Sequence, residues 1–236
     1  THIVLGNHDG NLKNEHRQDA ITPIVEALQN DNIHLLKDSG EVEVNDEVTL
    51  NVLSVFDREN WNEPSDPSKI NVALYHGSIS GCETGQGFTI QQGDDTASIF
   101  KGFDFAMLGD IHKRQQMDTE GRVWYAGSTV QQNFGESLRK GYILWNIHSK
   151  DDWTVEFHAL RNPRPFISIY LDRNGDLPET HVPRDAYLRI VSQYDLPLTK
   201  LRQAVDAAEV KWRPYSTTYV NRGTKNSRSA KSMIAD

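Results

Sequence analysis

The stretch from Phe103 to His112 reads Phe-Asp-Phe-Ala-Met-Leu-Gly-Asp-Ile-His. Its first part, Phe103 to Leu108, is short and nearly continuously apolar, which is typical of a strand buried on both faces of a sheet. The strand ends in Gly109-Asp110-Ile111-His112, so polar side chains follow its carboxyl end directly. The stretch therefore predicts an α/β fold in which the carboxyl ends of strands carry the chemistry.

Two further strand-like runs end in histidine-containing loops. Ile3 to Leu5 leads into Gly6-Asn7-His8-Asp9, and Ile70 to Tyr75 leads into His76-Gly77. A single histidine after a strand is more often a structural residue than a ligand. Three such histidines, each after a predicted strand and each beside Gly, Asp or Asn, indicate loops that converge on one site.

The residue types in these loops agree with one another. Imidazole nitrogens mixed with carboxylate and amide oxygens suit manganese, iron or zinc better than calcium or magnesium alone. A glycine beside each polar residue lets the backbone turn sharply and lets a phosphate approach it closely. The three loops therefore predict a metal site that a phosphate group can approach.

The remaining patterns predict the surrounding elements and the domain organisation. Residues 1–160 are expected to form one domain, residues 161–221 a small α+β domain after the Pro-rich joint Arg161–Pro165, and residues 222–236 a polar tail. In residues 1–160, apolar periodicity predicts a helix within Arg17–Gln29, a hairpin around Asn45-Asp46, a strand at Val123–Tyr125 and an antiparallel pair at Tyr142–Ile147 and Trp153–Leu160. In residues 161–221 it predicts strands at Phe166–Leu171, Tyr187–Val191 and Tyr215–Val220 and a helix at Leu198–Ala208.

The composition is that of an ordinary globular protein of 236 residues, with 37% hydrophobic and 25% charged residues. No apolar run has the length of a membrane helix, so no membrane partner is expected. The net charge of −8 argues against a scaffold that holds DNA by charge alone, but not against a metalloenzyme. The lone Cys82 excludes an internal disulfide and fits a reducing compartment, so we expect a cytoplasmic protein of a prokaryotic or phage-infected cell.

The three loops resemble the third, fourth and fifth motifs of the calcineurin-like metallophosphoesterases. The segments Tyr125-Ala126-Gly127-Ser128-Thr129 and Asn133-Phe134-Gly135-Glu136 resemble those of one branch, the SbcD-type DNA repair nucleases. The unit after Pro165 resembles the DNA-capping domain of that branch. The resemblance covers residues 1 to about 220 and implies a four-layer β-sandwich flanked by helices, with its first strands missing, plus the capping domain.

The resemblance also implies a role for each motif residue. Asn7, His76 and Asp110 would bind one divalent metal and His112 a second, with manganese preferred and magnesium the second choice. His8 would protonate the leaving oxygen or stabilise the transition state, and Asp9 would orient His8. The reaction would be attack of a metal-activated water on a phosphodiester. Lys113 and Arg114, which follow the fifth motif, would contact the DNA backbone or lie in a solvated loop.

Two departures from the family pattern affect these expectations. The first two motifs, Asp-x-His and Gly-Asp-x-x-Asp, do not precede Asn7, so we interpret the chain as N-terminally truncated and expect little or no nuclease activity from this polypeptide. Asp110 stands where better-known relatives carry histidine. Because aspartate ligates hard metals, it favours manganese or magnesium over zinc at a variant site.

Three functions remain open at this point. The leading hypothesis is the nuclease subunit of a DNA repair or recombination complex, with DNA and an SMC-like ATPase as partners and a homodimer implied by the resemblance. A phosphatase or nucleotide hydrolase on the same fold is the first alternative. A non-catalytic remnant that binds DNA or a partner is the second.

Overall fold

The computed structural model of the chain describes residues 1–14 and 17–223. The expected polar tail, residues 222–236, therefore lies outside the described residues from position 224 onward. Within the described ranges, neither α-helix combines the length and the apolar character that crossing a bilayer requires.

The chain divides into two compact units, each described here by itself. Unit 1 comprises Thr1–Ser128 and Gly141–Ala159, and unit 2 comprises Thr129–Lys140 and Leu160–Asp236. The division near residue 160 lies where the composition of the sequence shifts. The segment Thr129–Lys140, which the sequence analysis placed in the first domain, clusters instead with unit 2.

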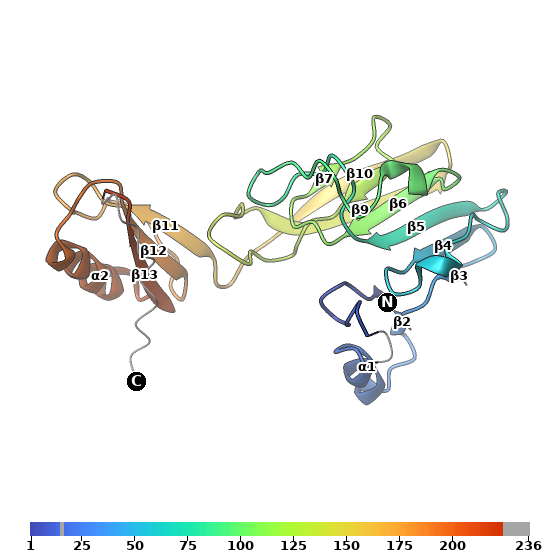
Figure 1. The fold of residues 1–236 in the computed structure, drawn as a ribbon, viewed down its shortest axis with the longest axis horizontal. Coiled ribbons are helices and arrows are strands. Elements are labelled where there is room, and N and C mark those ends of the chain that lie inside the picture. The colour runs from blue at the N-terminus through green and yellow to red at the C-terminus, as the bar shows by residue number, and fades with distance from the viewer. Residues whose placement is uncertain (15–16, 224–236) are drawn as a thin grey trace. The chain divides into compact units, whose positions relative to one another are not determined.

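Unit 1 is built on a six-stranded sheet in the order β3-β4-β5-β6-β8-β7 (Figure 1). Its four inner strands run parallel, while β3 and β7 are antiparallel to their neighbours. The strands are β3 (Gly40–Glu43), β4 (Val48–Leu53), β5 (Ile70–His76), β6 (Phe105–Gly109), β7 (Gln115–Gln116) and β8 (Val123–Tyr125). The hairpin expected around Asn45-Asp46 is confirmed, because the Asn45 side-chain oxygen accepts the amides of Glu47 and Val48 in the turn between β3 and β4.

Smaller elements complete unit 1. The strands β1 (His2–Val4) and β2 (His34–Leu36) form a separate parallel pair, with helix α1 (Thr22–Leu28) between them in sequence. The strands β9 (Lys140–Ser149) and β10 (Asp152–Leu160) form a second pair, and their two-residue link requires an antiparallel hairpin. Pro23 lies in the first turn of α1, where a proline is tolerated, and the helix buries no side chain.

The two faces of the large sheet are covered by different material. On one face, the loops that join the parallel strands pack against Ala73, Tyr75, Ala106, Leu108 and Tyr125 through Ile79, Cys82, Phe100 and Ile111. Apart from the two-residue strand β7, these loops contain only the short 3-10 turns η1 (Arg58–Asn60) and η2 (Ala97–Phe100). On the other face, Phe105 packs edge-to-face against Trp145 and Trp153 of the β9–β10 hairpin, with ring centroids 5.8 and 5.3 Å apart.

The observed fold is a mixed α/β fold, as the sequence predicts, but the expected four-layer sandwich flanked by helices is not confirmed. The described residues contain only two α-helices, and irregular loops rather than helices cover the core face of the large sheet. Trp61 packs edge-on against Tyr75 and donates its ring N–H to the Ser54 carbonyl at 2.8 Å.

Unit 2 contains a three-stranded parallel sheet in the order β11-β12-β13 and one helix. The strands are β11 (Phe166–Tyr170), β12 (Tyr187–Ser192) and β13 (Ser216–Asn221), and helix α2 (Leu198–Trp212) connects the last two. Helix α2 packs against one face of this sheet through Leu201, Ala204, Ala208 and Trp212 (Figure 1). A small α+β unit after Pro165 was expected from the sequence, and these elements match it in order and kind.

A buried aspartate fixes the start of α1. Asp19 is 6% exposed; one carboxylate oxygen accepts the amides of Ile21 and Thr22, and the other faces the Lys37 ammonium at 2.7 Å. Burial alone would raise the pKa of Asp19. The hydrogen bonds from Lys37, Thr22 and Ile21 outweigh this effect and hold the pKa well below its usual range.

We predict that Asp19→Asn destabilises the chain by about 1–2 kcal/mol at pH 7, because it removes the carboxylate charge that accepts the amides of Ile21 and Thr22 and pairs with Lys37. The folded-state pKa is depressed, so this contribution is complete above the unfolded-state pKa of about 3.9 and is lost as the pH falls toward the folded value. Urea unfolding at pH 7 and pH 3 measures both effects. Asp38→Asn, an exposed neighbour, is the control; equal stability of the two variants at pH 7 would contradict the prediction.

Candidate metal and phosphate site

The strand register brings two of the three predicted loops together. In the parallel pairing of β5 with β6, His76 lies opposite Gly109, so Asp110 immediately follows the residue that faces His76. Strand β1, which leads into Gly6 and Asn7, packs beside β5. All three loops therefore start from neighbouring strand ends, as expected for ligands gathered at the carboxyl edge of a parallel sheet.

Asn7, His76 and Asp110 form the centre of the site. The His76 Nε2 atom lies 3.6 Å from the Asp110 Oδ1 atom, too far for a hydrogen bond. The Asn7 amide nitrogen donates to the same Asp110 oxygen at 3.4 Å. The Asn7 Oδ1 atom is buried and has no hydrogen-bond partner among the described residues. Buried polar atoms without partners are uncommon, and at such a site they indicate a missing ligand or ion.

Two glycines allow the loops to approach His76 this closely. A Cβ atom on Gly6 would lie 2.6 Å from the His76 Cε1 atom, and one on Gly109 would lie 2.8 Å from its Nδ1 atom. Asp110 takes up a positive φ of 83°, a conformation unusual outside glycine and tolerated best by Asp and Asn. The glycines beside the ligands are thus required by close contact with the imidazole.

The environment of His76 favours the neutral imidazole. Burial lowers the pKa of His76 from its usual value; the carboxylates of Asp110 and Asp9 oppose the shift, and His8 and His112 add to it. A neutral imidazole is the form that binds a metal. The same interactions show that the predicted residues from all three loops lie within electrostatic reach of His76.

His8 and Asp9 lie in the turn that follows β1. His8 is exposed, whereas Asp9 is partly buried and accepts the Gly6 amide at 2.7 Å through its carboxylate. Asp9 therefore braces the loop that carries Asn7, and its expected role in orienting His8 stays a prediction. His112 lies after β6 and is partly buried.

Asn7, His76 and Asp110 can supply part of the coordination sphere of one divalent metal ion. Metal–ligand bonds of about 2.0–2.2 Å can span the 3.6 Å between His76 Nε2 and Asp110 Oδ1, and the unpartnered Asn7 oxygen is a third donor. In the described ranges, no group of three or more His, Cys, Asp or Glu side chains is arranged to hold a metal ion. The described residues therefore supply an incomplete coordination sphere for one ion, and the second metal expected at His112 stays a prediction.

Tyr125 fixes the loop that carries His76. Its ring is fully buried, and its hydroxyl donates to the Gly77 carbonyl at 2.7 Å and accepts the Ile79 amide at 2.9 Å. Two residues on, Gly127 has a φ of 79°, and a Cβ atom there would lie 2.9 Å from the Arg114 amide nitrogen. The Tyr125–Gly127 segment, used above as a family marker, thus packs against two of the three site loops.

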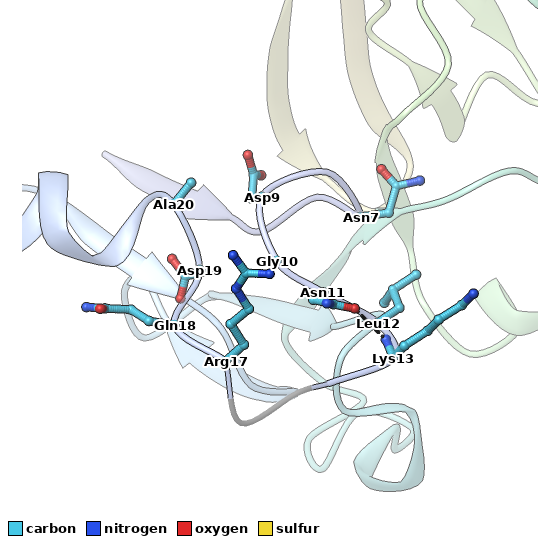
Figure 2. A pocket seen from close by; sticks show the side chains of 10 residues that line it. All are labelled: Asn7, Asp9, Gly10, Asn11, Leu12, Lys13, Arg17, Gln18, Asp19 and Ala20. Atoms are coloured by element: carbon cyan, nitrogen blue, oxygen red, sulfur yellow. Dashed lines mark hydrogen bonds between the residues drawn. The ribbon is translucent and has the colours of Figure 1, made fainter.

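A pocket of about 620 Å³ adjoins the Asn7 loop and is lined by Asn7, Asp9, Gly10, Asn11, Leu12, Lys13, Arg17, Gln18, Asp19 and Ala20 (Figure 2). Figure 2 shows the Arg17 side chain reaching back toward Gly10, while Lys13 extends away from it. Sequence reasoning missed both cations, because they follow the motif inside a polar stretch that carries no pattern of its own. Their charges suit a phosphate group beside Asn7.

Lys113 and Arg114 already have partners within unit 1. The Lys113 ammonium pairs with the Glu83 carboxylate, and the Arg114 guanidinium lies 4.4 Å from the centre of the Phe157 ring. Gln115 accepts the Glu83 amide at 2.8 Å and thereby ties β7 to the same loop. These contacts give both cations a structural role, and DNA contact by either stays a prediction.

We predict that Tyr125→Phe destabilises the chain by about 1–3 kcal/mol, because it leaves the buried Gly77 carbonyl and Ile79 amide without a partner. Urea unfolding monitored by circular dichroism measures the loss. Tyr142→Phe is the matched control, since Tyr142 is exposed and stacks on His158 through its ring. Equal losses in both variants would argue against a bracing role for the Tyr125 hydroxyl.

Comparison with known proteins gives partial matches. No protein-family model matches the chain. The chain is 32% identical over 201 residues to the uncharacterized protein R555 of Acanthamoeba polyphaga mimivirus, a match that covers 80% of this chain and 14% of that protein. It is 32% identical over 88 residues to the uncharacterized metallophosphoesterase YhaO of Bacillus subtilis (strain 168), covering 37% of this chain and 21% of that protein.

The chain therefore spans a small part of both relatives. The match to a metallophosphoesterase supports a relationship to the calcineurin-like family and, with it, to hydrolases. The site geometry is consistent with this relationship, since Asn7, His76 and Asp110, which lie close together, belong to the three segments that resemble motifs of this family.

Proposed function

We propose that this chain is part of a metal-dependent phosphodiesterase that cleaves DNA, working in a DNA repair or recombination complex with an SMC-like ATPase. The observation that carries the proposal is the convergence of Asn7, His76 and Asp110, with the Asn7 Oδ1 atom buried and unpartnered. The partial match to a metallophosphoesterase supports the hydrolytic class.

The chain's own residues have distinct tasks in this proposal. Asn7, His76 and Asp110 hold the metal, and a divalent cation bound there would supply Lewis-acid activation of water and of the phosphodiester. His8 is exposed on the same turn as Asn7, so it is placed to donate a proton to the leaving oxygen. Arg17 lines the adjoining pocket and offers charge to the phosphate.

The charge of unit 1 is consistent with cation binding. By sequence it contains 10 Lys and Arg against 24 Asp and Glu, a net charge of −14. A strongly acidic surface attracts divalent cations and repels polyanions unless a bound metal inverts the local field. Phosphodiester cleavage at this site should therefore require the metal for substrate binding as well as for chemistry.

We predict that the chain binds Mn²⁺ weakly at one site and that His76→Ala and Asp110→Ala each weaken binding at least tenfold, because each removes one of three donors. Electron paramagnetic resonance of free Mn²⁺ during titration measures the affinity. His148→Ala, an exposed histidine with no motif around it, is the control. Unchanged Mn²⁺ affinity in both site variants would refute the assigned ligands.

The substrate class is tested separately. Linear duplex DNA and p-nitrophenyl phosphate are offered with Mn²⁺ to the chain and to the His76→Ala variant. We expect that the chain cleaves DNA and that the His76→Ala variant does not. The cleavage should be slow, because the metal has an incomplete set of ligands. Turnover confined to p-nitrophenyl phosphate would instead favour a phosphatase.

A further inference from the structure

Two histidines lie beside each other on the small parallel sheet of unit 1. The register of β1 and β2 pairs His2 with His34. Side chains that are paired in this way point to the same side of a sheet. The two imidazole rings are stacked, with centroids 5.0 Å apart and an interplanar angle of 24°. The backbone of two strands therefore holds the two rings together.

This histidine pair is separate from the candidate metal site. His2 lies at the amino end of β1, whereas the loop with Asn7 follows the carboxyl end of the same strand. Both histidines are exposed. Within residues 1–14 and 17–223, neither ring forms an ion pair or a hydrogen bond with another side chain. The ring nitrogens are therefore open to a ligand from solvent.

The residue types determine which ligand suits the histidine pair. Imidazole nitrogens bind zinc, copper and nickel well, whereas magnesium and manganese prefer oxygen donors. Partial burial lowers the pKa of His2, and the neighbouring His34 lowers it further. The neutral imidazole, which is the form that binds a metal, is therefore favoured. The pair suits a borderline transition metal and differs in this respect from the site at Asn7, His76 and Asp110.

The distance between the rings is compatible with one shared ion. Zinc–nitrogen bonds of about 2.0–2.1 Å place two nitrogens on the same ion at most about 4 Å apart. Rings with centroids 5.0 Å apart can reach this separation by rotating about their side-chain bonds, because both side chains are exposed. Two protein donors leave the other positions of a tetrahedral ion to water, so the site would be an open one.

We propose that His2 and His34 bind a zinc ion that links β1 to β2. The two strands have three residues each and form a sheet of their own, and isolated two-stranded sheets are only marginally stable. Helix α1, which lies between them in sequence, buries no side chain. A metal that closes a long loop stabilises the folded chain by restricting the unfolded one. The loop closed here, residues 3–33, carries Asn7 and Arg17.

Calorimetric titration with Zn²⁺ tests the proposal on the whole chain. His2→Ala and His34→Ala should each weaken zinc binding about tenfold or more, because each removes one of two donors. Asp110→Ala alters the candidate metal site and should leave a zinc-binding event in place. His148→Ala removes an exposed histidine outside the pair and should bind zinc as the unchanged chain does.

Nuclear magnetic resonance identifies the ligands without altering the pair. In Asp110→Ala, added Zn²⁺ should shift the ring signals of His2 and His34, and amide hydrogen exchange in β1 and β2 should slow. Unchanged zinc affinity in His34→Ala, an equal loss in His148→Ala, or no shift of the two ring signals would each overturn the proposal. The proposal does not depend on the proposed function, so its failure leaves the Mn²⁺ titration to be judged by itself.

Discussion

The register between β5 and β6 determines whether the candidate metal ligands of this molecule lie together. It sets His76 opposite Gly109, so the next residue, Asp110, meets the imidazole. A slip of one residue would turn His76 to the opposite face of the sheet and separate the pair. Tyr125 holds the segment after His76 by two hydrogen bonds from within the core, so the site depends on the packing beneath it. Gly6 then lets the Asn7 loop close against the same ring.

The two units differ in charge and in the side chains that they present. Unit 1 is acidic and presents imidazole, amide and carboxylate donors at strand ends, which suits a cation. Unit 2 is basic, and its arginines Arg164 and Arg189 lie over the rings of Tyr215 and Phe134. The segment Thr129–Lys140 belongs to unit 2, where Phe134 packs on Phe166 and the Glu136 carboxylate pairs with Lys140 at 2.9 Å in a buried setting. A motif that looks like part of the first domain in sequence thus helps to build the second.

The sequence predicts the parts of this structure that depend on local pattern. The strand runs that end at His76 and Asp110, the hairpin at Asn45, and the strands and helix of unit 2 lie where periodicity and turn residues place them. Contacts between distant segments are harder to predict. Lys113 pairs with Glu83, and Trp61 packs on Tyr75, because each side chain meets a neighbour that tertiary packing supplies. The apolar stripe of α1 predicted the helix, but Ile24 and Leu28 remain 56% and 58% exposed.

The central claim is that Asn7, His76 and Asp110 surround a cation, and crystallography with manganese tests it most directly. Crystals of the chain grown with Mn²⁺ would be measured at the manganese absorption edge to locate the metal by anomalous scattering. The account predicts an anomalous peak bonded to Asn7 Oδ1, His76 Nε2 and the Asp110 carboxylate. A well-ordered site in which these three side chains contact each other or water, with manganese bound elsewhere, would contradict it.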